Sequence, residues 1–288
     1  MFSRYTLPAL IVIAGLLFGG AVAQGQAPTS TSPAPTLTRT PAPTRTPAPT
    51  PLPVEMFDLE VIATWPHDTA AYTQGLLLHE GMLYESTGLR GQSSLRMVDP
   101  ETGEVLRQRD IPIPYFAEGL ALVDERLIQI TWQEGVAFVY DIATFDLLET
   151  FNYTGEGWGL CYDGSDLYMS DGSEIITRRD PRTFEALETI RVTYNGQPVV
   201  RLNELECADD AIYANIWFSD FIVRIDKATG QVTGVIDAQG LLPDAERAAL
   251  PGGAVLNGIA YDPDADVFLI TGKLWPRLFV VRLVPRQE

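Results

Sequence analysis

Histidine and cysteine are scarce in this chain, which has two of each among 288 residues. A structural zinc site normally takes four cysteine or histidine ligands. One such site would have to use the chain's whole supply, His67, His79, Cys161 and Cys207, and we expect no metal and no cofactor. Basic residues are also few, at 20 against 38 acidic residues. Because nucleic acid is bound mainly through lysine and arginine, it is a poor candidate partner.

Long helical periodicity is absent as well. The one helix-like piece covers residues 242–250. Elsewhere the sequence consists of apolar runs of four to seven residues, separated by Gly, Asp, Asn and Pro. Short apolar runs between turn residues are typical of β-strands. The pattern therefore predicts an all-β protein.

The first 53 residues differ in composition from the rest. Residues 1–23 combine Arg4, an apolar run over 7–18 and the sequence Ala21-Val-Ala23, which is typical of a signal peptide. An uncleaved membrane anchor is the alternative, although the run is shorter than the roughly 20 apolar residues that span a bilayer. Residues 24–53 are almost all Pro, Thr, Ser and Ala, as in a disordered linker. We expect an exported protein, extracellular or in the cell envelope, with a possible membrane tether through residues 1–23.

The remaining residues, 54–288, are expected to form one acidic domain. Arg4, Arg39 and Arg45 lie outside it, so it holds 17 basic and 38 acidic residues, a net charge of −21. This acidity fits a well-solvated surface. It also fits an electrostatic field that attracts cationic substrates, such as peptides with free amino termini. We take a monomer as the starting expectation.

One short motif recurs five times along this domain. It occurs as Tyr72-Thr-Gln-Gly-Leu76, Phe116-Ala-Glu-Gly-Leu120 and Gly157-Trp-Gly-Leu160, and more loosely as Asn203-Glu-Leu-Glu206 and Leu256-Asn-Gly-Ile259. The central residues Gln74, Glu118, Trp158, Glu204 and Gly258 are separated by 44, 40, 46 and 54 positions. A period in the forties, built from short strands and tight turns, is typical of β-propeller blades. We predict a five-bladed β-propeller over residues 54–288, with the five motifs meeting at its central channel.

Each repeat is expected to supply the strands of one blade. The predicted strands are 72–78, 82–87, 94–98 and 105–110; 117–123, 126–132, 136–140 and 147–153; 158–162, 166–170, 175–179 and 186–193; 205–208, 211–217, 221–225 and 232–237; and 258–261, 267–271 and 278–283. The fifth repeat has only three strands, and a further strand, 58–64, precedes the first repeat. We expect strand 58–64 to close the fifth blade, because pairing the two ends removes an exposed sheet edge.

Cys161 and Cys207 occupy matching positions in two successive repeats. A disulfide needs Cα atoms within about 7 Å, and we expect equivalent positions on neighbouring blades to splay apart. Two buried free thiols are therefore predicted, although export would permit a disulfide.

Aromatic and polar residues gather on the predicted inner strands and the loops just beyond them. A tryptophan there can simply pack between blades, but four at corresponding positions favour an aromatic pocket. Glu118 is either a buried carboxylate bonded to backbone amides or, beside Phe116, an acid–base group whose pKa rises with lost hydration. Lys273 is either a surface lysine or a cation placed to stabilise an oxyanion. The full set is Tyr72, Gln74, Phe116, Glu118, Trp132, Trp158, Asn203, Glu204, Trp217, Asn257, Lys273 and Trp275.

Several of these segments together carry a resemblance. They include Ala71-Tyr-Thr-Gln-Gly75, Phe116-Ala-Glu-Gly119, Leu202-Asn-Glu-Leu-Glu206, Ala214-Asn-Ile-Trp217 and Thr271-Gly-Lys-Leu-Trp-Pro276. In this order and spacing, over residues 57–283, the chain resembles the glutaminyl-peptide cyclotransferases of the plant and bacterial type. That family has a five-bladed propeller and is unrelated to the zinc-dependent animal glutaminyl cyclases.

The resemblance implies a reaction and a site. The α-amine of an N-terminal glutamine, in a peptide or protein, attacks its own side-chain amide and gives pyroglutamate and ammonia. Glu118 would be the general acid–base, and Lys273, Asn203 and Trp217 would stabilise the amide oxyanion. The residues around the substrate would be Tyr72, Gln74, Phe116, Trp132, Trp158 and Trp217. Tyr72 departs from the phenylalanine that the family often has there and adds a hydroxyl group.

Two other functions fit the same residues. A non-catalytic propeller that binds peptides or sugars would also need tryptophan walls, and Glu118 and Lys273 would then be incidental. A glycosidase would need two carboxylates about 5–10 Å apart, for which Glu118 and Glu204 are the candidates.

Overall fold

The computed structural model describes residues 52–287. The predicted signal segment 1–23 and nearly all of the predicted linker 24–53 lie outside the described residues. Within residues 52–287 the one α-helix is α1 (Asp244–Arg247), and all other regular structure is β-strand. No helix in this range is long and apolar enough to cross a membrane.

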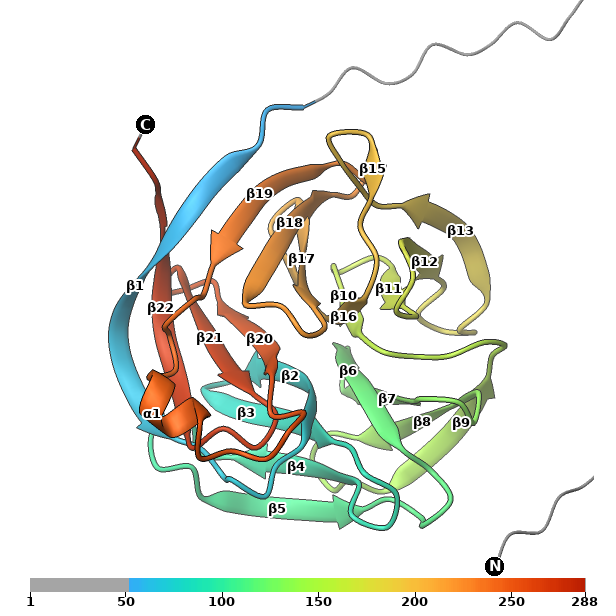
Figure 1. The fold of residues 1–288 in the computed structure, drawn as a ribbon. Helices are drawn as coiled ribbons and strands as arrows, with labels where there is room; N and C mark the ends of the chain where they lie inside the picture. The colour runs from blue at the N-terminus through green and yellow to red at the C-terminus, as the bar shows by residue number, and fades with distance from the viewer. Residues whose placement is uncertain (1–51, 288) are drawn as a thin grey trace, which may run out of the picture. The chain divides into compact units, whose positions relative to one another are not determined.

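Three of the sheets each consist of four consecutive antiparallel strands (Figure 1). Their order from the inside outward follows the chain. The first sheet is β2 (Thr73–His79), β3 (Met82–Thr87), β4 (Ser94–Val98) and β5 (Val105–Asp110); the second is β6 (Ala117–Val123), β7 (Arg126–Thr131), β8 (Val136–Asp141) and β9 (Leu147–Asn152); the third is β10 (Leu160–Tyr162), β11 (Leu167–Ser170), β12 (Ile175–Arg179) and β13 (Ala186–Arg191).

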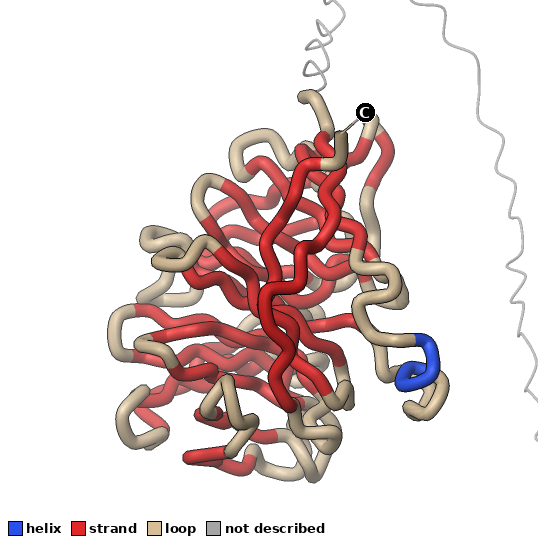
Figure 2. The backbone as a smooth tube through the Cα atoms, turned by 90° about the vertical axis from the view of Figure 1, so that its left-hand side faces the viewer, coloured by secondary structure: helices blue, strands red, loops and turns tan. Residues whose placement is uncertain are grey.

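A fourth sheet has eight strands and joins the two ends of the domain. Its order is β16-β17-β18-β19-β1-β22-β21-β20. The strands are β16 (Leu202–Ala208), β17 (Ala211–Ile216), β18 (Phe221–Asp226), β19 (Val232–Asp237), β20 (Leu256–Asp262), β21 (Val267–Gly272), β22 (Arg277–Pro285) and β1 (Glu55–Pro66). The first strand, β1, pairs antiparallel with the last, β22, and briefly parallel with β19. Figure 2 shows β1 crossing the side of the domain, and α1 projecting on the segment between β19 and β20.

The innermost strands stand around a common centre, so the fold is β-propeller-like. Strand β2 lies beside β6 and β20, β6 beside β10, β10 beside β16, and β16 beside β20. Apolar side chains fill the space between neighbouring sheets, as where Tyr84 and Leu95 of the first sheet pack in one cluster with Leu120 and Phe138 of the second. The five recurring motifs thus converge as predicted.

Glycine in the motif allows the inner strands to approach closely. A Cβ on Gly75 would lie within 3.0 Å of the Leu120 backbone nitrogen, and one on Gly119 equally near that of Leu160. The fourth motif has Glu204 at this place instead. Its side chain reaches across the centre and accepts hydrogen bonds from the backbone of Leu76 (3.3 Å) and Ile259 (2.9 Å). Glu204 is therefore a buried carboxylate bonded to backbone amides. This is the structural role that was considered above for Glu118.

In four of the five motifs, a polar residue near the start of the inner strand lies in a β-bulge. Pairing between inner and second strands shifts register around Gln74, Glu118, Asn203 and Asn257. Bulges re-aim side chains and are common beside active sites. The strand register also corrects which residues of the five motifs are equivalent. Asn203 and Asn257, and not Glu204 and Gly258, occupy the positions that Gln74 and Glu118 have in the first two motifs.

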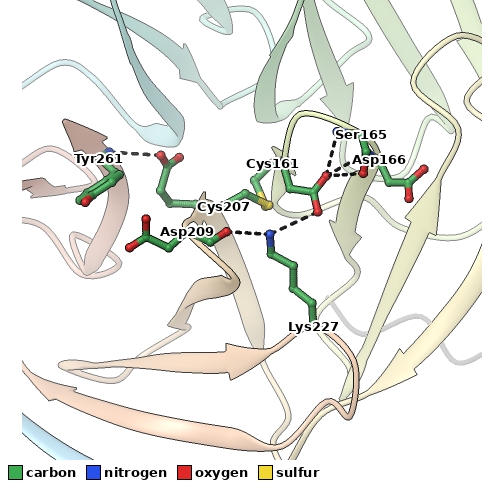
Figure 3. Close-up of a disulfide and its surroundings, with 9 residues drawn as sticks. Cys161, Ser165, Asp166, Cys207, Asp209, Lys227 and Tyr261 are labelled. Carbon is green, nitrogen blue, oxygen red and sulfur yellow. Dashed lines mark hydrogen bonds and ion pairs between the residues drawn. A yellow bond between two sulfur atoms is a disulfide. The ribbon is translucent and has the colours of Figure 1, made fainter. Parts of the chain in front are cut away.

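The prediction of two free thiols was wrong. Cys161 on β10 and Cys207 on β16 form a disulfide with a Cα–Cα distance of 5.4 Å (Figure 3). Neighbouring sheets diverge only toward their outer strands, while the inner strands run side by side, which brings these equivalent positions within bonding range. Close by, Lys227 Nζ donates to Asp163 Oδ2 (3.2 Å) and to the carbonyl of Asp209 (3.0 Å).

Predicted strand boundaries differ from the structure at several ends, among them those of β1, which covers Glu55–Pro66 and not 58–64. Strand β16 begins at Leu202, three residues earlier than predicted, and β10 begins at Leu160, two residues later. A small hairpin of β14 (Thr193–Tyr194) and β15 (Gln197–Pro198) was not predicted. Its turn residues Asn195 and Gly196 have φ of 50° and 76°, the geometry that favours Asn-Gly in hairpin turns.

Candidate active site

One cavity of about 180 Å³ brings the predicted site residues together. It opens where the inner strands β2, β6 and β16 begin and where the second strands β7, β17 and β21 end. All nine residues predicted to be catalytic or substrate-binding line it. They are Tyr72, Gln74, Phe116, Glu118, Trp132, Trp158, Asn203, Trp217 and Lys273.

The local backbone explains how these side chains reach the cavity. Gln74, Glu118 and Asn203 sit in the bulges at the start of their inner strands. Trp132 directly follows β7 and Trp217 directly follows β17. Each second strand ends beside the bulge of its own sheet, so one repeat delivers a polar group and an aromatic wall to the same place.

Gln74 links the two charged groups of the cavity. Lys273 Nζ donates to Gln74 Oε1 (2.6 Å), and Gln74 Nε2 donates to Glu118 Oε1 (3.2 Å). Asn257 Nδ2 donates to the carbonyl of Thr73 (2.9 Å) and to Gln74 Oε1 (3.4 Å), which fixes the orientation of the Gln74 amide. The bridge holds the ammonium and the carboxyl group on opposite sides of one amide.

Glu118 is buried, with 5% of its surface exposed. As predicted from its apolar setting, burial raises its pKa well above the usual value; Lys273 opposes the shift, and Glu156 and Glu134 add to it. Its Oε2 is buried and has no hydrogen-bond partner within residues 52–287. A raised pKa and a free oxygen suit a group that takes up and returns a proton.

Lys273 is also buried, at 3% exposure, which rules out the alternative of a surface lysine. Burial lowers its pKa to about 8, against the opposing effect of Glu118 and Glu204. Its Nζ lies 4.9 Å from the ring centroid of Tyr72, within range of a cation–π contact. The lysine is therefore a desolvated cation at neutral pH, held by an amide and an aromatic face.

Aromatic rings form an arc along the cavity. Edge-to-face contacts join Tyr72 to Phe116 (6.2 Å between centroids), Phe116 to Trp132 (5.7 Å) and Trp158 to Trp217 (5.3 Å). The contacts are of the kind that fix ring orientation. Three of the four tryptophans singled out in the sequence thus line the cavity.

Trp275, the fourth, does not. It is fully buried in an apolar cluster, and its Nε1 donates to the carbonyl of Ala254 (3.2 Å). Glu204 and Asn257 also lie outside the cavity lining. Because both oxygens of Glu204 accept backbone amides, it does not serve as a second catalytic carboxylate opposite Glu118, as the glycosidase hypothesis requires.

Two acidic residues at the cavity escaped the sequence reasoning. Glu156 Oε2 accepts hydrogen bonds from the indole nitrogens of Trp132 (2.8 Å) and Trp158 (3.0 Å). Glu134 pairs with Arg90 (2.5 Å), whose guanidinium lies 5.5 Å from the Trp132 ring centroid. Glutamates in exposed loops carry no sequence signal of such contacts; only their place next to the motif tryptophans hinted at a role.

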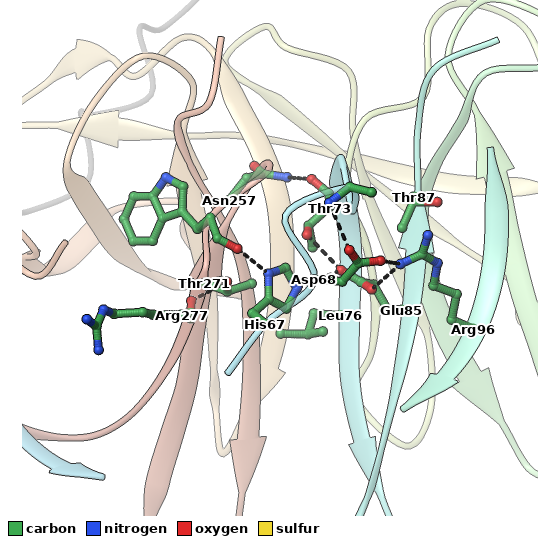
Figure 4. A network of polar contacts seen from close by, with 12 residues as sticks. His67, Asp68, Thr73, Leu76, Glu85, Thr87, Arg96, Asn257, Thr271 and Arg277 are labelled. Carbon is green, nitrogen blue, oxygen red and sulfur yellow. Dashed lines mark hydrogen bonds and ion pairs between the residues drawn. The ribbon is translucent and has the colours of Figure 1, made fainter. Parts of the chain in front are cut away.

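A buried polar network supports one side of the site (Figure 4). The His67 ring lies with Nε2 3.1 Å from Glu85 Oε1 and with Nδ1 2.8 Å from the carbonyl of Trp275. Thr73 Oγ1 donates to the same Glu85 oxygen (2.7 Å). His67 and Glu85 together thereby tie the loop that carries Lys273 to β2, the strand that carries Gln74.

Within residues 52–287 no group of three or more His, Cys, Asp or Glu side chains is arranged to hold a metal ion.

Comparison with known proteins places this geometry in context. The model of the glutamine cyclotransferase family matches residues 34–283. A glutaminyl-peptide cyclotransferase from Arabidopsis thaliana is 42% identical over 232 residues, which cover 78% of this chain and 71% of that protein. The crystal structure of Myxococcus xanthus glutaminyl cyclase is 43% identical and covers 81% of this chain and 99% of that one, with a TM-score of 0.76.

Proposed function

The chain belongs to the glutamine cyclotransferase family, and on that premise we propose that it converts the N-terminal glutamine of peptides to pyroglutamate with release of ammonia. The observation that carries the proposal is the pairing of a buried carboxyl group with a buried ammonium across Gln74, inside an aromatic cavity. A site that only bound peptides would not need Glu118 Oε2 to be buried without a partner.

Glu118 is the proton carrier in this proposal. The substrate α-ammonium has a pKa near 8, and Glu118 Oε2 accepts a proton from it. The freed amine forms a bond to the side-chain carbonyl carbon of the same glutamine. Glu118 then returns the proton to the side-chain nitrogen as the bond between that nitrogen and the carbon breaks, and ammonia leaves. The second surplus proton of the former ammonium leaves the ring nitrogen and is taken up by the departing ammonia, so the products are neutral pyroglutamate and ammonium. The raised pKa of Glu118 brings it closer to that of the amine, which favours transfer in both directions.

Lys273 stabilises the oxygen that becomes negative during attack. One Lys273 proton is engaged by Gln74, and the ammonium has others to offer to an oxyanion. Asn203 and the Trp217 indole line the same cavity as Lys273 and act with it. Asn203 Oδ1 is buried without a partner in the described part of the chain, so this amide also has an unused acceptor for the substrate.

The aromatic walls orient the substrate. The reaction is intramolecular, and the glutamine side chain must fold back over its own amine. A cavity of about 180 Å³ suits one such compact side chain. Holding reacting groups in contact can account for a large share of the rate, about 7–11 kcal/mol in the best intramolecular cases.

The test measures ammonia release from a glutamine-initiated dipeptide amide by the full chain and by Glu118→Gln. We expect turnover by the wild type and a loss of about 10²–10⁴-fold in kcat in the variant, with an unchanged circular dichroism spectrum. A folded wild-type protein that binds the peptide without turnover would favour a binding propeller. Equal turnover by both proteins would remove Glu118 as the acid–base.

We further propose that the propeller has five blades. The ring of five inner strands supports this count, and β1 would be the fourth strand of a last blade made with β20, β21 and β22. A crystal structure of this chain would check the count.

Export is the last part of the proposal. Residues 1–23 would direct the chain out of the cytoplasm, either as a cleaved signal or as a membrane tether, and residues 24–53 would act as a spacer. The Cys161–Cys207 disulfide supports an oxidising compartment. Sequencing the N-terminus of the cell-envelope and secreted fractions tests this, and light scattering tests the monomer.

A further inference from the structure

The aromatic arc of the cavity is interrupted between Trp132 and Trp158. Ring contacts join Phe116 to Trp132 on one side and Trp158 to Trp217 on the other. The Glu156 carboxylate bridges the interruption, because its Oε2 accepts both indole N–H groups, at 2.8 and 3.0 Å. A single oxygen atom of Glu156 therefore joins the two halves of the arc by hydrogen bonds.

The chemistry of the donors explains why a carboxylate stands here. An indole nitrogen can only donate, and an ionised carboxylate only accepts. Three donors converge on Glu156, since Gln133 Nε2 binds Oε1 at 2.8 Å. Partial burial would raise the pKa of Glu156, but the hydrogen bonds from Gln133, Trp158 and Trp132 hold it below the usual value. The group is thus ionised at neutral pH, and its bonds to the indoles are charge-assisted.

The backbone holds Glu156 independently of the indoles. The next residue, Gly157, donates its N–H to the carbonyl of Trp132 (2.8 Å). Tyr153 Oη donates to the carbonyl of Thr131 and accepts from its backbone nitrogen (3.0 Å). The loop is therefore fastened to the end of β7, and the rings take their orientation from the carboxylate rather than the reverse.

We propose that Glu156 is a positioning residue for the cyclisation: its carboxylate fixes the Trp132 and Trp158 indoles as walls of the cavity that Glu118 also lines. This rests on the proposed function. The role predicts two separable effects, one on substrate binding through the rings and one on the acid limb of the pH profile through the charge.

The charged and titratable groups around Glu118 determine the second effect. Lys273 lowers the pKa of Glu118, whereas Glu156 and Glu134 raise it. Tyr72 and Tyr153 are neutral near pH 7, because the ordinary pKa of tyrosine is about 10 and burial raises the pKa of both further. Removing the Glu156 charge therefore lowers the pKa of Glu118. Since the carboxylate form accepts the substrate proton, the acid limb of kcat/KM moves to lower pH.

Three variants of the full chain separate these effects. Glu156→Ala removes the charge and both indole bonds. Glu156→Gln removes the charge, but its amide oxygen can still accept both indoles once the Gln133 amide turns over. Glu134→Gln is the matched control, because Glu134 acts on Glu118 in the same direction and makes no bond to an indole.

We expect Glu156→Ala to raise KM about tenfold or more, as for the loss of hydrogen bonds to a charged group, with a smaller change in kcat. Glu156→Gln and Glu134→Gln keep KM within about threefold and shift the acid limb of kcat/KM downward. A KM for Glu156→Ala equal to that of Glu134→Gln, or an acid limb that stays in place in both charge variants, would overturn the proposal.

A readout without turnover keeps this test apart from the proposed function. The chain has five tryptophans, and each indole N–H group gives one signal that NMR can follow. We expect Glu156→Ala to move two of the five signals upfield and Glu134→Gln to leave those two in place. Unmoved indole signals would refute the proposal that Glu156 holds the two indoles, even in an active enzyme. Moved signals in a protein that releases no ammonia would retain that proposal and refute the proposed cyclisation activity.

Discussion

Gly159→Ala tests whether close approach of the inner strands builds the site. A Cβ at this position would lie far inside 3.0 Å of the carbonyl oxygen of Asn203, a distance that real Cβ contacts essentially never show. The obstructing atom is backbone, so no rotamer change relieves it. That oxygen also accepts from Ser170 Oγ (2.7 Å), and Ser170 Oγ in turn accepts from the backbone nitrogen of Gly159 (2.8 Å).

The expected cost follows from these contacts. Overpacking of this kind costs about 1–3 kcal/mol, and weakening the Ser170 bond adds about 1 kcal/mol. For a domain of this size each kcal/mol lowers Tm by about 2–4 °C, so Gly159→Ala should lower Tm by about 4–16 °C. Because the strands must move apart at Asn203, which lines the cavity, kcat/KM should fall as well.

Thermal unfolding and ammonia release check this beside a matched control. Gly252→Ala makes the same change at a glycine that has no atom within 4 Å of the added Cβ, and should stay within about 0.5 kcal/mol of wild type. Equal Tm values for the two variants would refute the argument that glycine sets the spacing of the inner strands. A lower Tm with unchanged kcat/KM would refute its extension to the site.

Three further outcomes are expected. Burial lowers the pKa of Lys273 to about 8, so kcat should fall as pH rises through about 8; a kcat constant to pH 10 would contradict the role of the ammonium. Replacing Cys161 and Cys207 together by serine should cost about 2–4 kcal/mol in urea unfolding, since the cross-link closes a long loop, with little effect on KM; an unchanged midpoint would argue against the disulfide. Burial alone would lower the pKa of His67, but Glu85 raises it above the usual value. The stability that this pair contributes is therefore complete below pH 6.5 and is lost as pH rises through the raised pKa; His67→Gln should abolish that part of the pH dependence of Tm, and an identical dependence in both proteins would contradict it.

Most strand positions were predictable, because strands depend on local patterns. The predicted strands 94–98 and 175–179 coincide with β4 and β12, since each is a short segment with β-forming residues that lies between turn residues. The hairpin of β14 and β15 was missed although Asn195-Gly196 is a recognised turn signal. Its strands have two residues each, too short for an alternating pattern to appear.

The nine cavity residues came from recognising the motifs, and the contacts among them did not. Gln74 bridges Lys273 and Glu118 because its amide oxygen faces the lysine and its amide nitrogen faces the carboxyl group. The spacing of residues in the sequence does not reveal this orientation. The contacts of Glu156 with the two indoles could not be predicted either, because they depend on the conformation of the loop that carries it. The Cys161–Cys207 bridge was mispredicted because the separation of two inner strands depends on the radius of the ring.

Pairing of β1 with β22 has a consequence for how the chain folds. Strand β1 is synthesised first and can pair with β22 only after β22 has been synthesised. The ring therefore closes through contacts of the highest sequence separation in the domain, and such contacts form slowly. Lys273 lies in the loop between β21 and β22, and Gln74 lies in β2, the strand after β1, so the hydrogen bond between Lys273 and Gln74 forms only when β1 and β22 have paired. During refolding, recovery of activity therefore reports the final step, after the separate sheets have acquired their strand structure.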